Sequence, residues 1–428
     1  MERLFFTRLS DFLEENHLLS PCQFGFREGR STSKAILDVV DKIYNLHDQG
    51  VHSAVIFIDL RKAFSSVNHS ILLEKLDKMG VRGVANDWVR SYLSDREQFV
   101  SVYDPDTGTE VDSDRRAVTC GVPEGAIVGP VMFLCFINDL PAYLTEGSTT
   151  LFADDMTILV SSPDKATLKI KVQKTLDQLN EWLNINKLSL NVEKSSVMLC
   201  YAAQNNFDVY IENKALPLSA QASFLGVIID FELKWTEQII QVKKKLNKAL
   251  FSLRSLHKSV DLDILRTCYF AYFASVMSYG IIFWGGHGCS KLIFTLQKKA
   301  VRLMVKNPPT VLNFSCRTKF KELEILTLPS IYIMETIMLA KHRLNDLPVN
   351  SDFHNYETRQ RQALHLPKVK KTCTQHSPVY VGSRLYNLLP ESLKQINSVS
   401  LFKKKLKTWL IECEFYSVQE FEEYCKTN

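Results

Sequence analysis

The chain of 428 residues is long enough for two or three domains with a substantial hydrophobic core. Hydrophobic residues make up 46% and charged residues 23%, a balance that excludes disordered and fibrous proteins. The formal net charge of +5 is too small to identify a nucleic-acid partner by itself, so the distribution of charge along the chain has to decide that question.

The 10 cysteines are scattered without a C-x-x-C pair, so we expect reduced thiols and predict no zinc site. Charged and polar residues interrupt the N-terminus before a signal-peptide core can form, which predicts an intracellular protein. Residues 267–286 carry no charge and are long enough to span a bilayer. Because this stretch is rich in Tyr, Phe, Ser and Gly, we predict a buried helix and strand there, with a membrane span as the alternative.

Helical periodicity dominates the first fifty residues, where a polar loop at 25–32 separates two amphipathic stretches. Residues 54–58 form a short apolar run rich in β-branched residues, which predicts a buried strand that ends at Asp59. A helix is predicted at 70–79. Residues 98–102 and 116–119 then read as the paired strands of a long hairpin, because the turn residues at 104–108 lie between them.

A second hairpin is predicted where apolar runs at 149–152 and 156–160 flank Ala153-Asp154-Asp155. A helix should follow, with Ser162 as its cap and Pro163 at its first position. Short strands are expected at 197–200, 209–211 and 224–229. A basic amphipathic helix is expected at 235–256, where the character of the chain changes.

Three carboxylates are the first candidates for chemistry. Asp59 is expected at the end of a buried strand, and Asp154 and Asp155 at a hairpin tip. If these strands are neighbours in one sheet, the carboxylates converge on one edge and raise each other's pKa unless a cation is bound. Two Mg²⁺ ions at such a site suit phosphoryl or nucleotidyl transfer. Without further signals, an Asp-Asp pair in a turn is an ordinary turn.

Six motifs surround these carboxylates in a fixed order over about 200 residues. They are Gln23-Phe24-Gly25-Phe26-Arg27 with Gly29-Arg30-Ser31-Thr32, Phe57-Ile58-Asp59-Leu60-Arg61-Lys62-Ala63-Phe64, Gly121-Val122-Pro123-Glu124-Gly125-Ala126-Ile127-Val128-Gly129-Pro130, Phe152-Ala153-Asp154-Asp155, Leu188-Ser189-Leu190-Asn191-Val192-Glu193-Lys194 and Phe224-Leu225-Gly226. In this order they resemble the reverse transcriptase family, most closely the polymerase of non-LTR (LINE-like, jockey-type) retrotransposons. The number and order of the motifs make the resemblance specific.

The resemblance implies an α+β right-hand polymerase fold with fingers, palm and thumb, in which a mixed sheet forms the palm. Residues 1–235 would be fingers and palm, 236–310 a helical thumb and 311–428 a basic C-terminal extension. Twelve Lys or Arg stand against two Asp within 241–306, and eleven stand against one Glu within 359–410. These stretches would bind template–primer phosphates, the alternative being solvated amphipathic faces.

The resemblance also implies the catalytic centre. Asp59, Asp154 and Asp155 would bind two Mg²⁺ ions, with Mn²⁺ as a substitute, and would catalyse nucleotidyl transfer. Phe64 would be the steric gate that rejects a ribose 2′-hydroxyl, the alternative being an ordinary core Phe.

Further residues would contact the substrates. Gly121 and Gly125 would allow close approach of nucleotide and template, because a Cβ would obstruct it. The other implied contacts are Arg27 and Arg30 with the triphosphate, Lys194 with the leaving pyrophosphate, and Phe224, Leu225 and Gly226 as the primer grip. Solvated surface charges are the alternative for both arginines and the lysine.

Three positions depart from the family pattern. Glu124 stands where Gln is usual, Ala126 where Ser is usual, and Ser65 where an acid is often present. A carboxylate at 124 adds repulsion beside a triphosphate and removes a donor. Because no departure removes a metal ligand, we expect an RNA-directed DNA polymerase. The alternative is an inactive copy that only binds nucleic acid.

The remaining expectations concern the context of the chain. Elements of this type carry an endonuclease upstream, so we expect an N-terminally truncated fragment of a longer polyprotein, or a chain that uses a nick made elsewhere. The sequence has no second cluster of acidic residues that would indicate an RNase H domain. The implied partners are an RNA template, a DNA primer and dNTPs, with no membrane. Copying at a nicked target would require a nuclear location.

Overall fold

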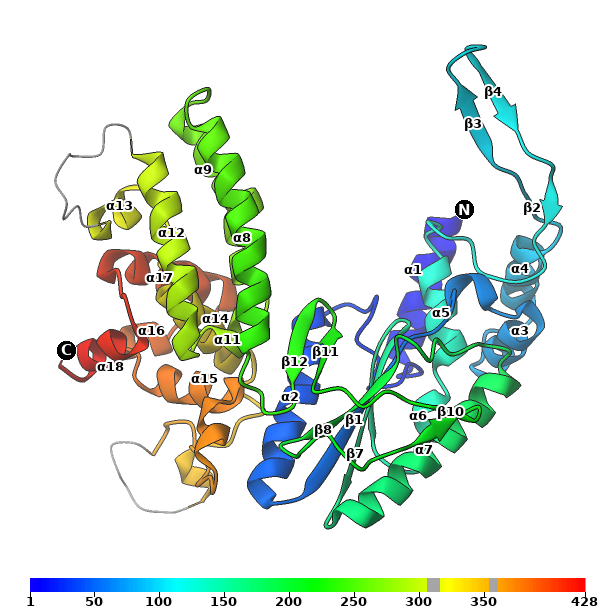
Figure 1. Cartoon of the computed structure of the whole chain (residues 1–428), viewed down its shortest axis with the longest axis horizontal. Coiled ribbons are helices and arrows are strands. Elements are labelled where there is room, and N and C mark those ends of the chain that lie inside the picture. The colour runs from blue at the N-terminus through cyan, green and yellow to red at the C-terminus, as the bar shows by residue number, and fades with distance from the viewer. Residues whose placement is uncertain (306–315, 354–360, 428) are drawn as a thin grey trace. The chain divides into compact units, whose positions relative to one another are not determined.

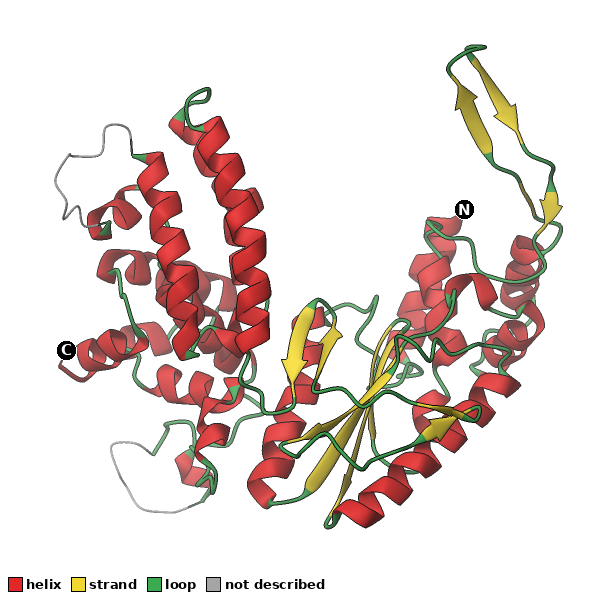
Figure 2. Ribbon diagram, in the orientation of Figure 1, coloured by secondary structure: helices red, strands yellow, loops and turns green. Residues whose placement is uncertain are grey.

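The computed structural model describes residues 1–305, 316–353 and 361–427, and its chain divides into two compact units (Figure 1). The first unit is Met1–Val39 with Gly50–Leu225, and the second is Val40–Gln49 with Gly226–Asn428. Figure 2 shows that the first unit combines a sheet with helices, whereas the second is built from helices. The helix–sheet composition predicted for the chain is therefore confirmed, and it is concentrated in the first unit.

The core of the first unit is a four-stranded sheet in the order β6-β7-β1-β8. The strands are β1 (His52–Ile58), β6 (Ser148–Phe152), β7 (Asp155–Ser162) and β8 (Ser196–Cys200). All three ladders are antiparallel, and isolated parallel bridges join Gln23 to Leu151 at the β6 edge and Leu218 to Val197 at the β8 edge. Because β1 lies between two strands, every residue from Ser53 to Ile58 is buried, as the apolar run predicts.

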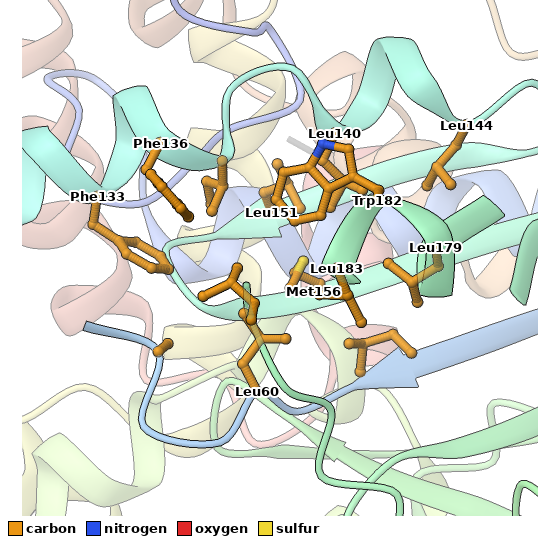
Figure 3. Packing of buried hydrophobic residues seen from close by; sticks show 14 of the residues in the cluster. Leu60, Phe133, Phe136, Leu140, Leu144, Leu151, Met156, Leu179, Trp182 and Leu183 are labelled. Atoms are coloured by element: carbon orange, nitrogen blue, oxygen red, sulfur yellow. The ribbon is translucent and has the colours of Figure 1, made fainter. Parts of the chain in front are cut away.

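One face of the sheet is covered by helix α7 (Lys165–Ile185), whose buried residues repeat at helical spacing. Figure 3 shows Leu179, Trp182 and Leu183 of this helix packed with side chains of the strands and of other helices. The predicted start of the helix is wrong by two positions. Strand β7 extends through Ser162, and the side chain of Asp164 caps the helix by accepting a 2.8 Å hydrogen bond from the Thr167 amide.

Other helices of the first unit pack around this core. They are α1 (Glu2–Glu15), α3 (His69–Lys78), α4 (Val84–Leu93), α5 (Gly129–Ile137), α6 (Leu140–Tyr143) and the short η1 (Phe64–Ser66), together with the first part of α2 (Thr32–Gln49). Asp38 on α2 accepts a 2.6 Å hydrogen bond from the Thr150 hydroxyl on β6, so this helix lies against the sheet. Helix α5 is apolar on all sides and buried from Val131 to Ile137, and Figure 3 shows its Phe133 and Phe136 at one side of the packed cluster.

The first predicted hairpin is present, with a different inner register. Its strands are β2 (Glu97–Gln98), β3 (Ser101–Asp104), β4 (Thr109–Asp112) and β5 (Arg116–Ala117). Gln98 pairs with Arg116, which joins the two predicted strands, but Val102 pairs with Val111 and not with the second predicted strand. The turn residues at 104–108 therefore close a short inner ladder.

The strand predicted at 224–229 is wrong, because a turn interrupts it. Strand β11 (Gln221–Phe224) ends before Leu225 and Gly226, whose φ angles are +48° and +79°, and β12 (Val227–Asp230) begins after them. Left-handed φ values at both central residues are typical of tight hairpin turns. A further small hairpin is formed by β9 (Tyr210–Ile211) and β10 (Lys214–Ala215).

The second unit contains the end of α2, strand β12 and, after them, the basic amphipathic helix α8 (Thr236–Leu256). Ile239, Val242 and Leu246 are buried, whereas Lys244, Lys248 and the apolar Phe251 are exposed. The other helices are α9 (Leu262–Cys268), π-helical η2 (Tyr269–Ala274), α10 (Ser275–Ser278), α11 (Ile281–Trp284), η3 (Gly288–Ser290), α12 (Lys291–Met304), α13 (Arg317–Glu322), α14 (Leu328–His342), η4 (Asn350–Asp352), η5 (Thr372–His376), α15 (Pro378–Asn387), α16 (Glu391–Lys394), α17 (Val399–Cys413) and α18 (Val418–Thr427).

Residues 267–286 form short helical segments that break at Gly280, where φ is +63°, so the strand predicted in this stretch is wrong. Within the described ranges, no helix has the length and apolar character needed to cross a membrane. The predicted border between thumb and extension at 310/311 lies outside the described residues. The division of the second unit into these two parts stays a prediction.

Candidate active site

The three candidate carboxylates lie at one end of the sheet of the first unit. Asp59 directly follows β1, whose last residue Ile58 pairs with Met156 of β7. Phe152 pairs with Asp155, so Ala153 and Asp154 form the two-residue turn between β6 and β7. Strands β1 and β7 are therefore neighbours, as convergence of the carboxylates requires. Asp59 lies beside the hairpin tip that carries Asp154 and Asp155.

The carboxylates influence each other electrostatically. Partial burial raises the pKa of Asp154 above its usual range, and the charge of Asp59 raises it further. Partial burial also raises the pKa of Asp155, and the charges of both other carboxylates raise it further. A divalent cation would remove this repulsion, since it favours the ionised form of each carboxylate.

Asp59 is oriented by the loop after α7. The side-chain amide of Asn191 donates a 2.9 Å hydrogen bond to Asp59 Oδ2, and the Asn191 backbone amide donates another 2.9 Å bond to the Asp59 carbonyl. Ser195 Oγ accepts from the Asp59 amide at 3.1 Å and donates to the Asn191 carbonyl at 2.8 Å. Asn191 lies in a recognised motif, but the orienting roles of Asn191 and Ser195 were missed at the sequence level.

A pocket of about 430 Å³ opens beside Asp154, a volume within the usual range for small-molecule sites. Its lining residues are Phe26, Leu60, Lys62, Ala63, Phe64, Pro123, Glu124, Gly125, Pro130 and Asp154. Among them, exposed Lys62 is a candidate phosphate contact that the sequence analysis did not select. The pocket thus joins two carboxylates, one cation and the predicted gate residue.

Phe64 is both a pocket residue and a core residue. Its ring stacks on Phe133 of α5 with 4.5 Å between ring centroids, a contact worth about 1 kcal/mol beyond burial. The side chain remains half-buried and forms part of the pocket wall. The two interpretations of Phe64 are therefore compatible, because packing against Phe133 fixes the ring that faces the pocket.

The segment from Gly121 to Gly125 contributes Pro123, Glu124 and Gly125 to the pocket wall. The Val122 amide donates a 2.9 Å hydrogen bond to the Phe64 carbonyl. Gly121 has φ +91°, and a Cβ there would lie 2.8 Å from the Ser65 carbonyl oxygen, so its close approach is to the protein backbone. Gly125 has φ +81° with open space where a Cβ would point, which leaves room for a ligand in the pocket.

Two of the residues that depart from the family pattern are hydrogen-bonded to each other. Ser65 Oγ donates a 2.7 Å bond to Glu124 Oε1, and both side chains are exposed. The carboxylate on the pocket wall therefore has a fixed donor, which a pair of carboxylates at these positions would lack. This contact joins residues 59 positions apart in the chain, and no sequence pattern indicates it.

The two candidate arginines differ in what they contact. Arg27 forms a two-bonded ion pair with Glu14, at 2.7 and 2.6 Å, and also donates to the Ser20 carbonyl. Its side chain is only 10% exposed, so its donors serve the fold in this structure rather than a phosphate. The Arg30 guanidinium lies over the Phe24 ring, with its Cζ 4.9 Å from the ring centre, a cation–π contact.

The remaining predicted site residues lie apart from the pocket lining. Lys194 is exposed, and it belongs to the loop that orients Asp59. Phe224 is 3% exposed and its ring lies 6.3 Å from that of Phe57 on β1, so it packs on the sheet. Leu225 and Gly226 form the turn at which the two units divide, and the predicted primer grip stays a prediction.

The carboxylates at this sheet end offer oxygen ligands of the kind that Mg²⁺ prefers. In the part of the chain that the structure describes, no three His, Cys, Asp or Glu side chains form a ready-made metal cage. Mg²⁺ bound through one or two carboxylates and substrate phosphates needs no such cage. Asp59 and Asp154 beside a nucleotide-sized pocket fit that mode of binding, in which the substrate supplies the missing ligands.

Comparison with known proteins gives a consistent result. The family model described as "Reverse transcriptase (RNA-dependent DNA polymerase)" matches residues 1–229. The probable RNA-directed DNA polymerase from transposon BS of Drosophila melanogaster is 28% identical over 326 residues, which cover 72% of this chain and 35% of that protein. The RNA-directed DNA polymerase from mobile element jockey of Drosophila funebris is 24% identical over 393 residues, covering 88% of this chain and 42% of that protein.

The chain spans less than half the length of these relatives. Among solved structures, apo telomerase from Candida Tropicalis aligns with 100% of this chain and 61% of its own at a TM-score of 0.42 and 12% identity. A likeness at this score carries no argument. The similarity to known proteins therefore rests on the sequence motifs and the family model.

Proposed function

Because the chain belongs to the reverse transcriptase family, we propose that it acts as the RNA-directed DNA polymerase of a non-LTR mobile element. It would add deoxynucleotides to the 3′-hydroxyl of a DNA primer in the order set by an RNA template. The observation that carries this proposal is the meeting of Asp59 and the Asp154 turn at one sheet end, beside a pocket that contains Phe64.

The residues of the pocket suggest how the reaction is organised. Asp59 and Asp154 would hold Mg²⁺, with Asp155 supporting them through its charge. The bound metal would supply a lowered pKa for the primer hydroxyl and neutralisation of the phosphate charge. Asn191 holds the Asp59 carboxylate in place, and Lys62 would bind phosphate oxygens at the pocket mouth.

Selection of deoxynucleotides would rest on Phe64. Its ring is fixed by stacking on Phe133, so it cannot turn aside without losing that contact. A ribose 2′-hydroxyl next to this ring would find an apolar surface and no hydrogen-bond partner. The rigid ring therefore supports the steric-gate role that the family resemblance implies.

Binding of the template and primer would use the basic face of α8. Lys243, Lys244, Lys245 and Lys248 are all exposed on this helix, while Val242, Leu246 and Leu250 are buried. Contacts between such lysines and phosphates are independent of sequence and weaken as salt rises. If copying is primed at a nicked chromosomal target, the protein would act in the nucleus.

Primer extension tests the proposal. The wild-type chain is incubated with poly(rA), oligo(dT), dTTP and Mg²⁺ at low salt, beside Asp154→Asn and the control Asp87→Asn, which changes an exposed carboxylate on α4. We expect extension by the wild type and the control and none by Asp154→Asn. Extension that persists in Asp154→Asn would contradict the assigned site.

A second candidate function is nucleic-acid binding without catalysis. The observation that favours it is the Glu124 carboxylate on the pocket wall, which would repel a triphosphate. In that case none of the three chains extends the primer, although all bind the template–primer duplex equally. The same experiment, with a binding measurement added, distinguishes the two functions.

A further inference from the structure

Gln23 lies beneath the turn that carries Asp154, although it is 130 residues away in the chain. The segment before α2 runs along the edge of β6: the Phe24 amide donates to the Leu151 carbonyl at 2.7 Å, and the Leu151 amide donates to the Cys22 carbonyl at 2.9 Å. This pairing brings the Gln23 side chain, 2% exposed, under the hairpin tip. The position is therefore built by backbone hydrogen bonds.

One atom of the Gln23 amide accepts two hydrogen bonds. Oε1 receives the Ala153 amide at 3.0 Å and the Gly25 amide at 2.8 Å. Because both partners are N–H donors, the atom between them has to be the oxygen, which fixes the orientation of the amide group. The Nε2 atom is then buried without a hydrogen-bond partner.

The turn held in this way is conformationally unusual. Ala153 has φ +54°, a left-handed value that residues with a Cβ rarely adopt. Gly25 packs directly on it, since a Cβ at position 25 would lie 2.5 Å from the Ala153 nitrogen. The Ala153 conformation thus depends on the Gln23 oxygen from one side and on the absence of a side chain at Gly25.

We propose that Gln23 is a positioning residue, whose neutral amide oxygen sets the conformation of Ala153 and thereby the direction in which Asp154 presents its carboxylate. This inference rests on the proposed function for its catalytic consequence. A carboxylate at position 23 could accept the same two bonds without an unpaired donor, but it would place a further negative charge near three carboxylates. A neutral acceptor avoids that repulsion at the cost of one unpaired N–H group.

The test uses Gln23→Met, which removes the acceptor at similar size, and Gln23→Glu, which keeps it. Gln178→Met is the matched control, because Gln178 Oε1 also accepts two bonds, from the Thr145 amide and hydroxyl, on the exterior of the same unit. Three quantities are measured on the full chain: hydrogen exchange of peptides containing Gly25 and Ala153, Mn²⁺ affinity, and the single-turnover rate of dTTP addition.

For Gln23→Met we expect faster exchange at Gly25 and Ala153, weaker Mn²⁺ binding, and an addition rate lowered about 10–100-fold with little change in dTTP affinity, because a small misplacement of a catalytic group slows the chemical step. Gln23→Glu should keep the protection of both amides. It should also bind Mn²⁺ more tightly, since it adds a negative charge. Gln178→Met should match the wild type in all three measurements.

Unchanged exchange and unchanged Mn²⁺ binding in Gln23→Met would overturn the inference, whatever the polymerase activity. If Gln23→Met does not fold, Gln23→Glu decides: loss of protection at Ala153 in a folded Gln23→Glu chain would equally overturn it. A wild-type chain that does not extend a primer would refute the proposed function. The exchange and Mn²⁺ results would still show whether Gln23 positions the turn.

Discussion

The two sides of the candidate site are held in different ways. On the carboxylate side, neutral side chains from distant loops hold the functional groups: Asn191 binds Asp59, and Gln23 binds the backbone beside Asp154. On the wall that contains Glu124, the backbone at Gly121 packs closely on the backbone at Ser65, and Ser65 holds the charged Glu124. The difference shows that neutral side chains orient the carboxylates whose charge has to remain available for a cation. On the pocket wall, the charge of Glu124 is instead bound by the Ser65 hydroxyl.

The strongest test of this comparison is a substitution of Asp154 on the carboxylate side. Asp154→Asn removes one anionic ligand and preserves shape, so we expect the rate of primer extension to fall by about 10³-fold or more, equivalent to several kcal/mol of lost charge stabilisation. Single-turnover extension measures the change. A loss of only a fewfold would mean that Asp154 is not a principal metal ligand.

The next largest effect is expected on removal of the neutral Asn191 amide that binds the Asp59 carboxylate. In Asn191→Ala the Asp59 carboxylate loses its 2.9 Å donor, and we expect Mn²⁺ affinity or extension rate to fall about 10–100-fold, as for other groups that orient a metal ligand. Titration with Mn²⁺ and a rate measurement check this. Asn205→Ala, in a loop of the same unit, serves as control, and equal behaviour of the two variants would contradict the orienting role.

The pocket wall that contains Glu124 is tested by substitutions of the Ser65–Glu124 pair. Ser65→Asp alone sets two carboxylates against each other, and we expect extension to fall about 10-fold because like charges in contact repel. Adding Glu124→Gln should restore most of the rate, since an amide can donate to the new carboxylate. If the double variant is no better than Ser65→Asp, the two positions are not coupled.

The smallest predicted effect is a pH-dependent stabilisation by Mg²⁺. The pKa values of Asp154 and Asp155 are raised in the folded chain, so their contribution to stability is fullest below the ordinary pKa of Asp and is lost as pH rises through the raised values. Mg²⁺ should offset this loss, because it binds the ionised carboxylates.

Thermal unfolding with and without Mg²⁺ checks this expectation. The midpoint should rise more at pH 7.5 than at pH 5, because protons compete with the metal at the lower pH. Asp154→Asn should show a smaller rise than the wild type at pH 7.5. An equal rise in both chains at both pH values would place the stabilising Mg²⁺ elsewhere.

Local patterns predicted the elements that carry the carboxylates. The run before Asp59 is apolar and β-branched because β1 lies between two strands, and the runs around Ala153 and Asp154 pair as a hairpin. The helix start at Ser162 was wrong because β7 continues through that residue, and Asp164 supplies the cap. Strand length depends on pairing partners, whereas a cap signal is read from neighbouring residues alone.

The sequence by itself determined the family, through the order of its motifs, and it placed Asp59 after a strand and Asp154 at a hairpin tip, because periodicity and turn chemistry are local properties. Only the tertiary structure decided that Arg27 pairs with Glu14, that Ser65 binds Glu124, and that Gln23 supports Ala153. Each of these contacts forms between segments that folding brings together, and a hydrogen bond between distant residues leaves no periodic signal in a single sequence.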